Sequence, residues 1–219
     1  MWFVMEKAQT SYSLSQQLLS LASGGGGAFP WLAAASGSAC PSITAVIAKG
    51  VDVNEAFGNN LPLHVACLHN NCLAVAELIS CGADVNLVDG HGRTPCHYAA
   101  EHCADCLARL LRQKADPSIP DATLRLPLHW AVYVNKADCV RLLLESGCNP
   151  NCRDFNGETP LSFGAYRGSL ESLQVLLEFN ALPDISSYTG STPLARLAQT
   201  IAVGIGSSKD WQCLQLLLR

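Results

Sequence analysis

The chain has 219 residues, of which 49% are hydrophobic and only 15% are charged, and its net charge is −4. This hydrophobic content excludes an intrinsically disordered chain, and the slight acidic excess argues against a nucleic-acid-binding surface. Eleven cysteines in a sequence without an export signal predict free thiols in a reducing compartment, and therefore a cytoplasmic protein.

Residues 1–28 are predicted to form an N-terminal helix and a glycine-rich linker. The apolar start Met1–Met5 is followed by Glu6, Lys7 and several hydroxyl side chains, which is not the charged-then-apolar pattern of a signal peptide. The linker contains the run Gly24–Gly27. No stretch reaches the roughly 18–20 apolar residues that span a bilayer, so we expect no membrane contact.

From residue 29 onward the sequence repeats with a period of about 33 residues. A motif that contains proline, LPLHVA at Leu61–Ala66, recurs at nearly constant spacing. Its recurrences are Thr94–Ala99, Leu126–Ala131, Thr159–Gly164 and Thr192–Leu197. A second motif, such as GADVN at Gly82–Asn86, follows each proline at an almost constant distance and therefore stays in phase with the first. Two markers with one period indicate an internal repeat.

The period divides residues 29–219 into six units, of which the first is degenerate and rich in Ala, Gly and Ser. The units span residues 29–54, 61–86, 94–118, 126–151, 159–184 and 192–219. In the last unit Cys213 lies farther from its proline than the matching Cys139 does, so an insertion within Val203–Trp211 enlarges the turn between its two helices. The second helix, expected at Cys213–Leu218, is apolar without a polar cap, which leads us to expect a truncated chain.

Each unit is predicted to contain two helices and a turn. Thr or Leu precedes a proline in the first turn of a helix, where the missing N–H costs nothing. A second helix follows with apolar residues at helical spacing, such as Val140, Leu143 and Leu144. A glycine such as Gly147 ends that helix, and turn dipeptides such as Asn156–Gly157 predict hairpins that project from the stack.

A unit of this length with a Thr-Pro-Leu-His-x-Ala signature resembles the ankyrin repeat. The resemblance covers residues 29–219 and implies an all-α solenoid of helix-turn-helix pairs with projecting hairpin loops. Because one unit cannot bury its own apolar face, stacking of neighbours supplies the core. The resemblance also implies protein binding, with a protein target in the concave groove of the stack.

Several longer segments are similar to the ankyrin repeat and SOCS box family. They are Met1–Met5 with Ser11–Ser15, Arg93–Glu101, Leu126–Ala131, Leu143–Gly147 and Gly168–Ser172. Members of that family are non-catalytic substrate receptors of cullin-RING ubiquitin ligases, in which ankyrin repeats hold the target and a C-terminal SOCS box binds elongin B, elongin C and a cullin. The SOCS box is absent here, and Ser23–Ser42 departs from the family pattern. An ankyrin adaptor or inhibitor without a ubiquitin role is the alternative.

The sequence offers no catalytic constellation, since it has no Ser/His/Asp order, phosphate-binding Walker loop or His-Glu-x-x-His. His64, His97 and His129 share one slot of the repeat, but helices stack about 10 Å apart, which is too far for shared ligation of one zinc ion. We expect each imidazole to hydrogen-bond to the backbone of an adjacent loop. The chain is therefore predicted not to be an enzyme.

A Cys-x-x-Cys at Cys103 and Cys106, near His97 and His102, is a conceivable metal or redox site. However, the sequence has no second cysteine pair at a suitable spacing and no preceding strand. The other cysteines occupy slots that hold small or apolar residues in neighbouring units, so cysteine is expected to act as a small hydrophobic residue. No cofactor is predicted, and a zinc-binding redox sensor at this pair stays as an alternative.

The predicted binding surface is the concave groove. In ankyrin stacks the residue after the histidine slot and the residue three positions later face this groove. Here both positions are rich in aromatic side chains, which are enriched in binding hot spots. The aromatic candidates are Tyr98, Trp130, Tyr133, Phe163 and Tyr166. Packing between repeats is the alternative role, and the sequence leaves both open.

The tips of the hairpin loops are a second candidate, because loops on one face of a repeat array usually carry recognition. Arg93 and Arg125 are the predicted partner-binding residues of this group. The other candidates are His91, Asp121, Asp154, Glu158 and Tyr188. Simple solvation is the alternative role for any single charge.

Overall fold

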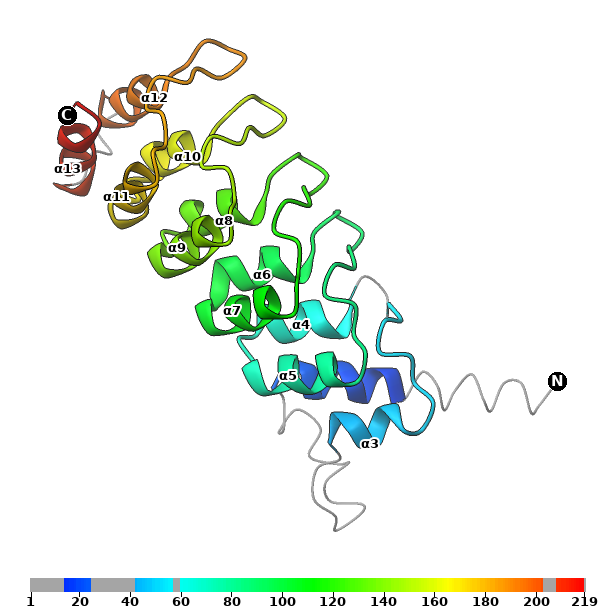
Figure 1. The fold of residues 1–219 in the computed structure, drawn as a ribbon. Coiled ribbons are helices and arrows are strands. Elements are labelled where there is room, and N and C mark those ends of the chain that lie inside the picture. The colour runs from blue at the N-terminus through cyan, green and yellow to red at the C-terminus, as the bar shows by residue number, and fades with distance from the viewer. Residues whose placement is uncertain (1–13, 25–41, 57–59, 203–207, 219) are drawn as a thin grey trace.

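The computed structural model describes residues 14–24, 42–56, 60–202 and 208–218 of the chain. Within these residues the helices follow one another in pairs that stack into an elongated array, and hairpin loops project along one side of it (Figure 1). The predicted all-α solenoid of helix pairs is confirmed. None of the described helices is long and apolar enough to cross a membrane.

Each pair has an inner helix beside the hairpin loops and an outer helix behind it (Figure 1). The inner helices are α4 (Pro62–Leu68), α6 (Pro95–His102), α8 (Pro127–Tyr133), α10 (Pro160–Arg167) and α12 (Pro193–Thr200). The outer helices are α3 (Ile43–Ile47), α5 (Cys72–Ser80), α7 (Ala104–Arg112), α9 (Ala137–Glu145), α11 (Leu170–Glu178) and α13 (Ser208–Leu217). Inner helices pack on inner helices and outer helices on outer ones. The segments that join one pair to the next, 81–94, 113–126, 146–159 and 179–192, are called finger loops below.

Proline begins each of these inner helices, as predicted. In α10 and α12 the preceding threonine, Thr159 or Thr192, accepts a hydrogen bond through its side chain from the backbone of the first turn. Such caps satisfy N–H groups that the first turn of a helix leaves without a partner. The starts of α10 and α12 are therefore fixed by local hydrogen bonds that the repeat motif supplies.

The chain leaves α5, α7, α9 and α11 through one residue in the left-handed backbone region. These residues, with their φ angles, are Gly82 (89°), Lys114 (62°), Gly147 (94°) and Asn180 (62°). A residue with positive φ ends a helix and turns the chain away from its axis, here into the finger loop. Three of the four are Gly or Asn, which adopt this conformation at low cost, whereas Lys114 adopts it with strain.

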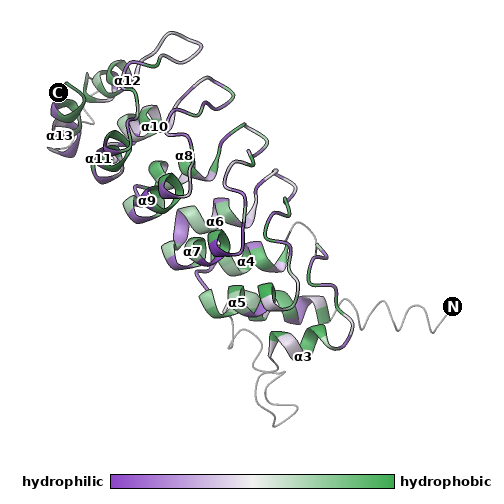
Figure 2. Cartoon of the chain, viewed as in Figure 1, coloured by the Kyte–Doolittle hydropathy of each residue, from purple (hydrophilic) through white to green (hydrophobic). Residues whose placement is uncertain are grey.

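One hydrophobic core runs along the whole stack, and Figure 2 shows hydrophobic residues along its entire length. Leu107, Leu143 and Leu173 of successive outer helices are fully buried between the helix layers. Burying one leucine side chain stabilises a fold by roughly 1.5–3 kcal/mol. Cys96 and Cys139 are buried in the same core, in the role of small apolar residues that the sequence predicts for them.

Three buried histidines connect consecutive repeats, as predicted. The Nε2 atom of each lies 2.9–3.3 Å from a carbonyl oxygen of the next finger loop, and the pairs are His64 with Arg93, His97 with Arg125, and His129 with Glu158. In His97 and His129 the Nδ1 atom accepts the backbone N–H of Thr94 and Leu126, so the neutral ring carries its proton on Nε2 and donates to the carbonyl.

Backbone hydrogen bonds and asparagine side chains add two further sets of contacts between repeats. At the finger tips, N–H groups donate to the preceding loop over 3.0 Å, from Ala122 to His91, Phe155 to Thr123 and Tyr188 to Asn156. Beside the outer helices, an asparagine Oδ1 accepts an N–H of the next repeat over 2.8 Å, in the pairs Asn54 with Asp84, Asn86 with Asp116 and Asn151 with Leu182. These contacts fix the register of each repeat against the next.

At the N-terminal end, residues 14–22 form a helix with Leu18 and Ala22 buried. The side chain of Asn71, at the start of α5, donates over 3.2 Å to the carbonyl oxygens of Leu21 and Ala22. This helix therefore ends against the next outer helix, where the inner helix of a preceding repeat would end. The inner helix predicted near Pro30 lies outside the described residues, and the boundaries of the degenerate unit stay a prediction.

At the other end, the last outer helix begins earlier than the predicted Cys213–Leu218. It starts at Ser208, so part of the predicted insertion is helical. Cys213 is buried in its expected slot, and the carboxylate of Asp210 lies against Gly168, where a Cβ atom would meet it. Asp210 lies in the first turn of this helix, which the spacing of apolar residues did not predict.

The buried histidines predict a stability that depends on pH. Burial lowers the pKa of His129 to about 4 and lowers the pKa values of His64 and His97, whereas an unfolded histidine titrates near 6.5. As pH falls, the unfolded chain therefore binds protons first, so the free energy of unfolding declines below about pH 6.5. His129 contributes up to about 1.4 kcal/mol per pH unit until about pH 4. Urea unfolding at pH 7, 6 and 5 measures this decline; equal midpoints, or an undiminished decline in His129→Gln, would contradict the interpretation.

The strained left-handed residue gives a second prediction. Lys114→Gly relieves the positive φ that Lys114 adopts, and we expect the free energy of unfolding to rise by about 0.5–1 kcal/mol. Gly147→Ala is the reverse change at the same repeat position, where a Cβ would meet no atom within 4 Å, so it should destabilise by backbone strain alone. Chemical denaturation of both variants tests this, and a less stable Lys114→Gly would show that the strain is absent.

Candidate protein-binding groove

Aromatic side chains of three inner helices line the face beside the finger loops. Tyr98 belongs to α6, Trp130 and Tyr133 to α8, and Phe163 and Tyr166 to α10. The ring centroid of Tyr133 lies 6.2 Å from that of Trp130 and 6.4 Å from that of Phe163, both in edge-to-face contact. Such pairs contribute about 0.5–1.5 kcal/mol beyond the surface they bury. The three rings form one aromatic surface across two repeats.

Two arginines of the finger loops extend this aromatic surface. The guanidinium carbon of Arg93 lies 4.1 Å from the ring centre of Trp130 and 5.7 Å from that of Tyr98, so it joins α6 to α8. Arg125 repeats the arrangement at 5.6 Å from Trp130 and 5.1 Å from Phe163. The π-faces of the rings attract the positive charges. The seven predicted residues, Tyr98, Trp130, Tyr133, Phe163, Tyr166, Arg93 and Arg125, therefore lie on one surface, called the groove surface below.

The groove surface is neither fully buried nor fully exposed. Tyr166 is 50% exposed, and the other four aromatic side chains are half-buried. Tyr98 and Phe163 also pack against the hydrophobic core. These side chains thus take part in packing between repeats and still offer area to a partner, and their role in binding stays a prediction.

In finger loops 81–94 and 113–126, one aspartate links the loop to the aromatic surface. Asp121 accepts backbone N–H groups of its own loop through Oδ1, including that of Arg125 at 3.0 Å, and accepts Nε1–H of Trp130 through Oδ2 at 3.1 Å. Asp89 accepts the hydroxyl of Tyr98 in the same way at 2.7 Å. Burial opposes ionisation of Asp121, but its hydrogen bonds outweigh burial, and the pKa lies below its ordinary value.

Asp154 occupies the same position in finger loop 146–159, but it lacks the hydrogen bond from an aromatic side chain that Asp89 and Asp121 accept. Its Oδ1 atom accepts the backbone N–H of Glu158 at 2.9 Å. The matching inner-helix residue is Phe163, which has no donor, so Oδ2 finds no hydrogen bond among the described residues. Arg125 Nε lies 3.5 Å from Oδ2, which makes an ion pair without a hydrogen bond, and the side chain of Asp154 is 1% exposed.

A pocket of about 360 Å³ opens beside Asp154. Its wall includes Glu158 of the finger loop and Arg196 of α12, which form an ion pair. Burial raises the pKa of Glu158, and the charge of Arg196 opposes part of that rise. The other lining residues are Arg125, His129, Trp130, Tyr133, Asn156, Phe163 and Tyr166. The sequence-based site omitted Arg196, although it occupies the slot after the histidine slot and the period could have identified it.

Three buried polar atoms on this face lack hydrogen bonds within the described part of the chain. They are Glu101 Oε1, Arg125 Nε and Asp154 Oδ2. The Oε1 atom of Glu101 lies 3.9 Å from the guanidinium of Arg93, which is too far for a hydrogen bond. Because at least nine in ten buried polar groups in proteins have a partner, such atoms mark places where an incoming group could bond.

Side chains that could hold a metal lie away from the groove, among the outer helices. The Sγ atoms of Cys72, Cys103 and Cys106 all lie within 4.8 Å of one another. The two histidines near Cys103 and Cys106 in the sequence have other partners. His97 bonds to a finger-loop carbonyl, and His102 pairs with Glu101 at 3.6 Å. Cys72 was not a candidate of the sequence-based prediction.

Comparison with known proteins identifies the repeated unit. The family model for ankyrin repeats, which contains three copies of the repeat, matches residues 31–121 and 128–207, which is most of the chain. A search of curated proteins found no match. The matched segments contain the three cysteines and every residue of the groove surface except Arg125.

The exposure of Tyr166 predicts that the groove can be altered without loss of the fold. Tyr166→Ala should change the free energy of unfolding by less than about 0.5 kcal/mol, because half of the side chain faces solvent. Leu161→Ala removes a fully buried side chain of the same helix and should cost about 2–5 kcal/mol. Urea unfolding compares the two; similar losses would show that Tyr166 belongs to the core.

Proposed function

The chain belongs to the ankyrin-repeat family, and from this premise we propose that it is a non-catalytic protein-binding module whose partner occupies the groove surface. The observation that carries the proposal is the pocket beside Asp154, where aromatic rings surround buried polar atoms without hydrogen bonds. Aromatic and arginine side chains dominate the binding energy of protein interfaces, and both are concentrated here. The family supports protein binding, and the pocket supports the proposal that the partner binds at the groove surface.

The chemistry of the pocket favours a partner group that both donates and accepts. Asp154 Oδ2 is an acceptor and Arg125 Nε a donor, 3.5 Å apart. A backbone amide or a side-chain amide or hydroxyl of the partner would satisfy both atoms, while an apolar side chain beside it would contact Trp130, Tyr133 and Phe163. Because hydrogen bonds to charged groups stabilise more than neutral ones, this pair would fix the register of the partner.

The finer proposal is that the module recognises substrates for a cullin-RING ubiquitin ligase in the cytoplasm. Its support is the resemblance to the ankyrin repeat and SOCS box family, and two of the similar segments, Arg93–Glu101 and Leu126–Ala131, carry groove residues. Recruitment of elongin B, elongin C and a cullin would require a SOCS box, which residues 1–219 do not contain. An adaptor or inhibitor without a ubiquitin role is the second candidate, supported by the same groove.

Affinity capture from cell lysate tests the groove. The baits are the natural chain, the double variant Tyr133→Ala/Tyr166→Ala, and Leu73→Ala, which removes a 77% exposed side chain of outer helix α5. We expect the groove variant to lose proteins that the natural chain and Leu73→Ala retain. Retention of every partner by a folded groove variant would contradict the proposed site.

The ligase role needs a separate comparison. Capture with this chain and with the product of the complete transcript should give shared substrates, and only the longer product should retain elongin B, elongin C and a cullin. Elongins captured by neither form would favour the adaptor, while the groove result above would be unaffected.

A further inference from the structure

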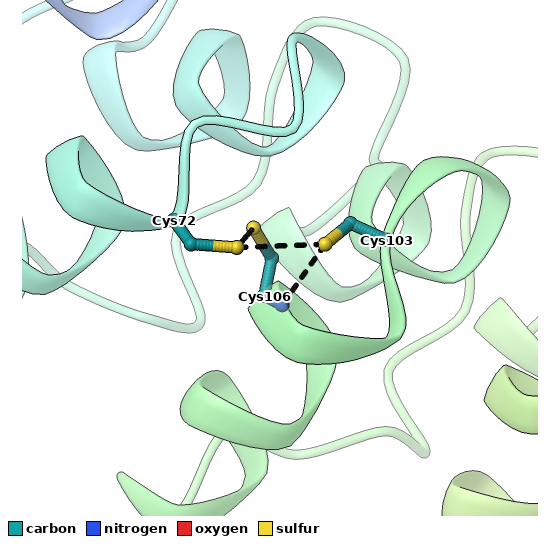
Figure 3. Close-up of side chains that lie close together, drawn as sticks. All are labelled: Cys72, Cys103 and Cys106. Atoms are coloured by element: carbon teal, nitrogen blue, oxygen red, sulfur yellow. Dashed lines mark hydrogen bonds between the residues drawn. The ribbon is translucent and has the colours of Figure 1, made fainter.

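Three thiols meet where the second and third outer helices pack together. Cys72 is the first residue of α5, Cys103 caps the N-terminus of α7, and Cys106 is the third residue of α7. The Sγ atom of Cys72 lies 2.8 Å from that of Cys106 and 3.5 Å from that of Cys103 (Figure 3). All three Sγ atoms point toward one centre between the two helices (Figure 3).

Stacking does not require sulfur at these positions, because the same three positions meet at later junctions with other residues. Between α7 and α9 they are Ala104, Lys136 and Cys139, and between α9 and α11 they are Ala137, Ser169 and Ser172. Small residues, a lysine or serines therefore suffice for packing. Three cysteines at one junction need an explanation other than the core.

As neutral thiols, the three cysteines form only weak hydrogen bonds with one another. S–H is a weak donor and sulfur a weak acceptor. A bound metal ion would replace these weak contacts by bonds to thiolates, since it deprotonates the thiols that coordinate it.

We propose that Cys72, Cys103 and Cys106 bind one zinc ion, with the side-chain oxygen of Asn70 as the fourth ligand. Zn–S bonds of about 2.3 Å place the sulfurs of a tetrahedral site about 3.8 Å apart, and a Zn–O bond of about 2.1 Å places an oxygen about 3.6 Å from each sulfur. Asn70 Oδ1 lies 3.9 Å from the sulfur of Cys72 and 4.0 Å from that of Cys106. Small rotations of the side chains therefore complete the tetrahedron.

The helix ends favour the thiolates that zinc requires. Cys72 lies in the first turn of α5, and Cys103 and Cys106 lie at the N-terminus of α7, where the helix dipole stabilises negative charge. The backbone N–H of Cys106 points at the sulfur of Cys103 over 3.3 Å. Zinc binding replaces three S–H bonds by three Zn–S bonds and releases three protons to solvent, which leaves one net negative charge for these dipoles to offset.

The ligand set selects the class of metal. Thiolates favour zinc and copper(I), whereas magnesium and calcium require oxygen ligands. A fourth ligand at tetrahedral distance favours zinc, because copper(I) is satisfied by three sulfurs in a plane. The ion would join the turn between α4 and α5, the start of α5 and the start of α7, and so connect two adjacent repeats.

Spectroscopic titration of the complete chain, reduced and free of metal, tests the site. Cobalt(II) is the probe, because tetrahedral thiolate coordination gives it an intense charge-transfer band that zinc lacks. We expect one cobalt per chain, complete displacement by one zinc, and a higher melting temperature with zinc bound. Absence of the band, or binding of copper(I) without binding of zinc, would overturn the proposal.

Matched variants show where the metal binds. At the position of Cys72 the next repeat has Ala104, and at the position of Cys106 the preceding repeat has Ala74. The variants Cys72→Ala and Cys106→Ala therefore introduce a residue that the fold already accepts, and both should fold. Loss of a ligand should weaken zinc binding by more than the 10- to 100-fold that loss of an outer-shell group typically causes. Cys139→Ala, at the position of Cys106 one repeat later, should bind zinc as the natural chain does.

Two results of the variant series would contradict the assignment. Equal zinc affinity in folded Cys106→Ala and Cys139→Ala would place the metal on other residues. A loss of two hydrogens from the natural chain, seen by mass spectrometry under mild peroxide and unaffected by saturating zinc, would show that Cys72 and Cys106 form a disulfide instead of a metal site.

Discussion

The hydrogen bond from each buried histidine to the next finger loop is the contact on which the rest of the structure depends. No helix pair can bury its apolar face alone, so the fold exists only if successive pairs stack in one register. His97 and His129 fix that register twice, through Nδ1 to their own cap and through Nε2 to the following loop. The same register brings each finger loop over the inner helix beside it, and so produces the groove surface.

The fold could be predicted from the sequence because its determinants are local and recur in every unit. Proline at the start of each inner helix, the histidine slot and the left-handed residue after each outer helix can all be located by counting residues. Prediction fails where the period breaks. An N-terminal helix was predicted within residues 1–28, but its bounds at 14–22 could not be derived, because it lies before the first proline motif. The first turn of α13 contains Asp210, which lies against Gly168, a residue far from it in the sequence.

The candidate sites, too, could be predicted where they depend on slots of the repeat, but not where they depend on stacking. The aromatic residues and the two arginines could be selected from their slots, but the stacking of Arg93 on Trp130 depends on an offset between neighbouring repeats that no slot reveals. The Oδ2 atom of Asp154 lacks a hydrogen bond because of a single substitution, Phe163 where the two preceding repeats have tyrosine or tryptophan. Cys72 was missed because the sequence was searched for a second pair of closely spaced cysteines. Stacking instead brings Cys72 into contact with Cys103 and Cys106, which are 31 and 34 positions away.

We propose that a partner protein binds the groove surface between the finger loops and the inner helices. Hydrogen–deuterium exchange of the chain, alone and saturated with a captured partner, tests this binding mode most directly. We expect the partner to slow exchange in finger loops 113–126 and 146–159 and in α8 and α10. Slower exchange confined to the outer helices α7, α9 and α11 would contradict the claim and place recognition on the opposite face.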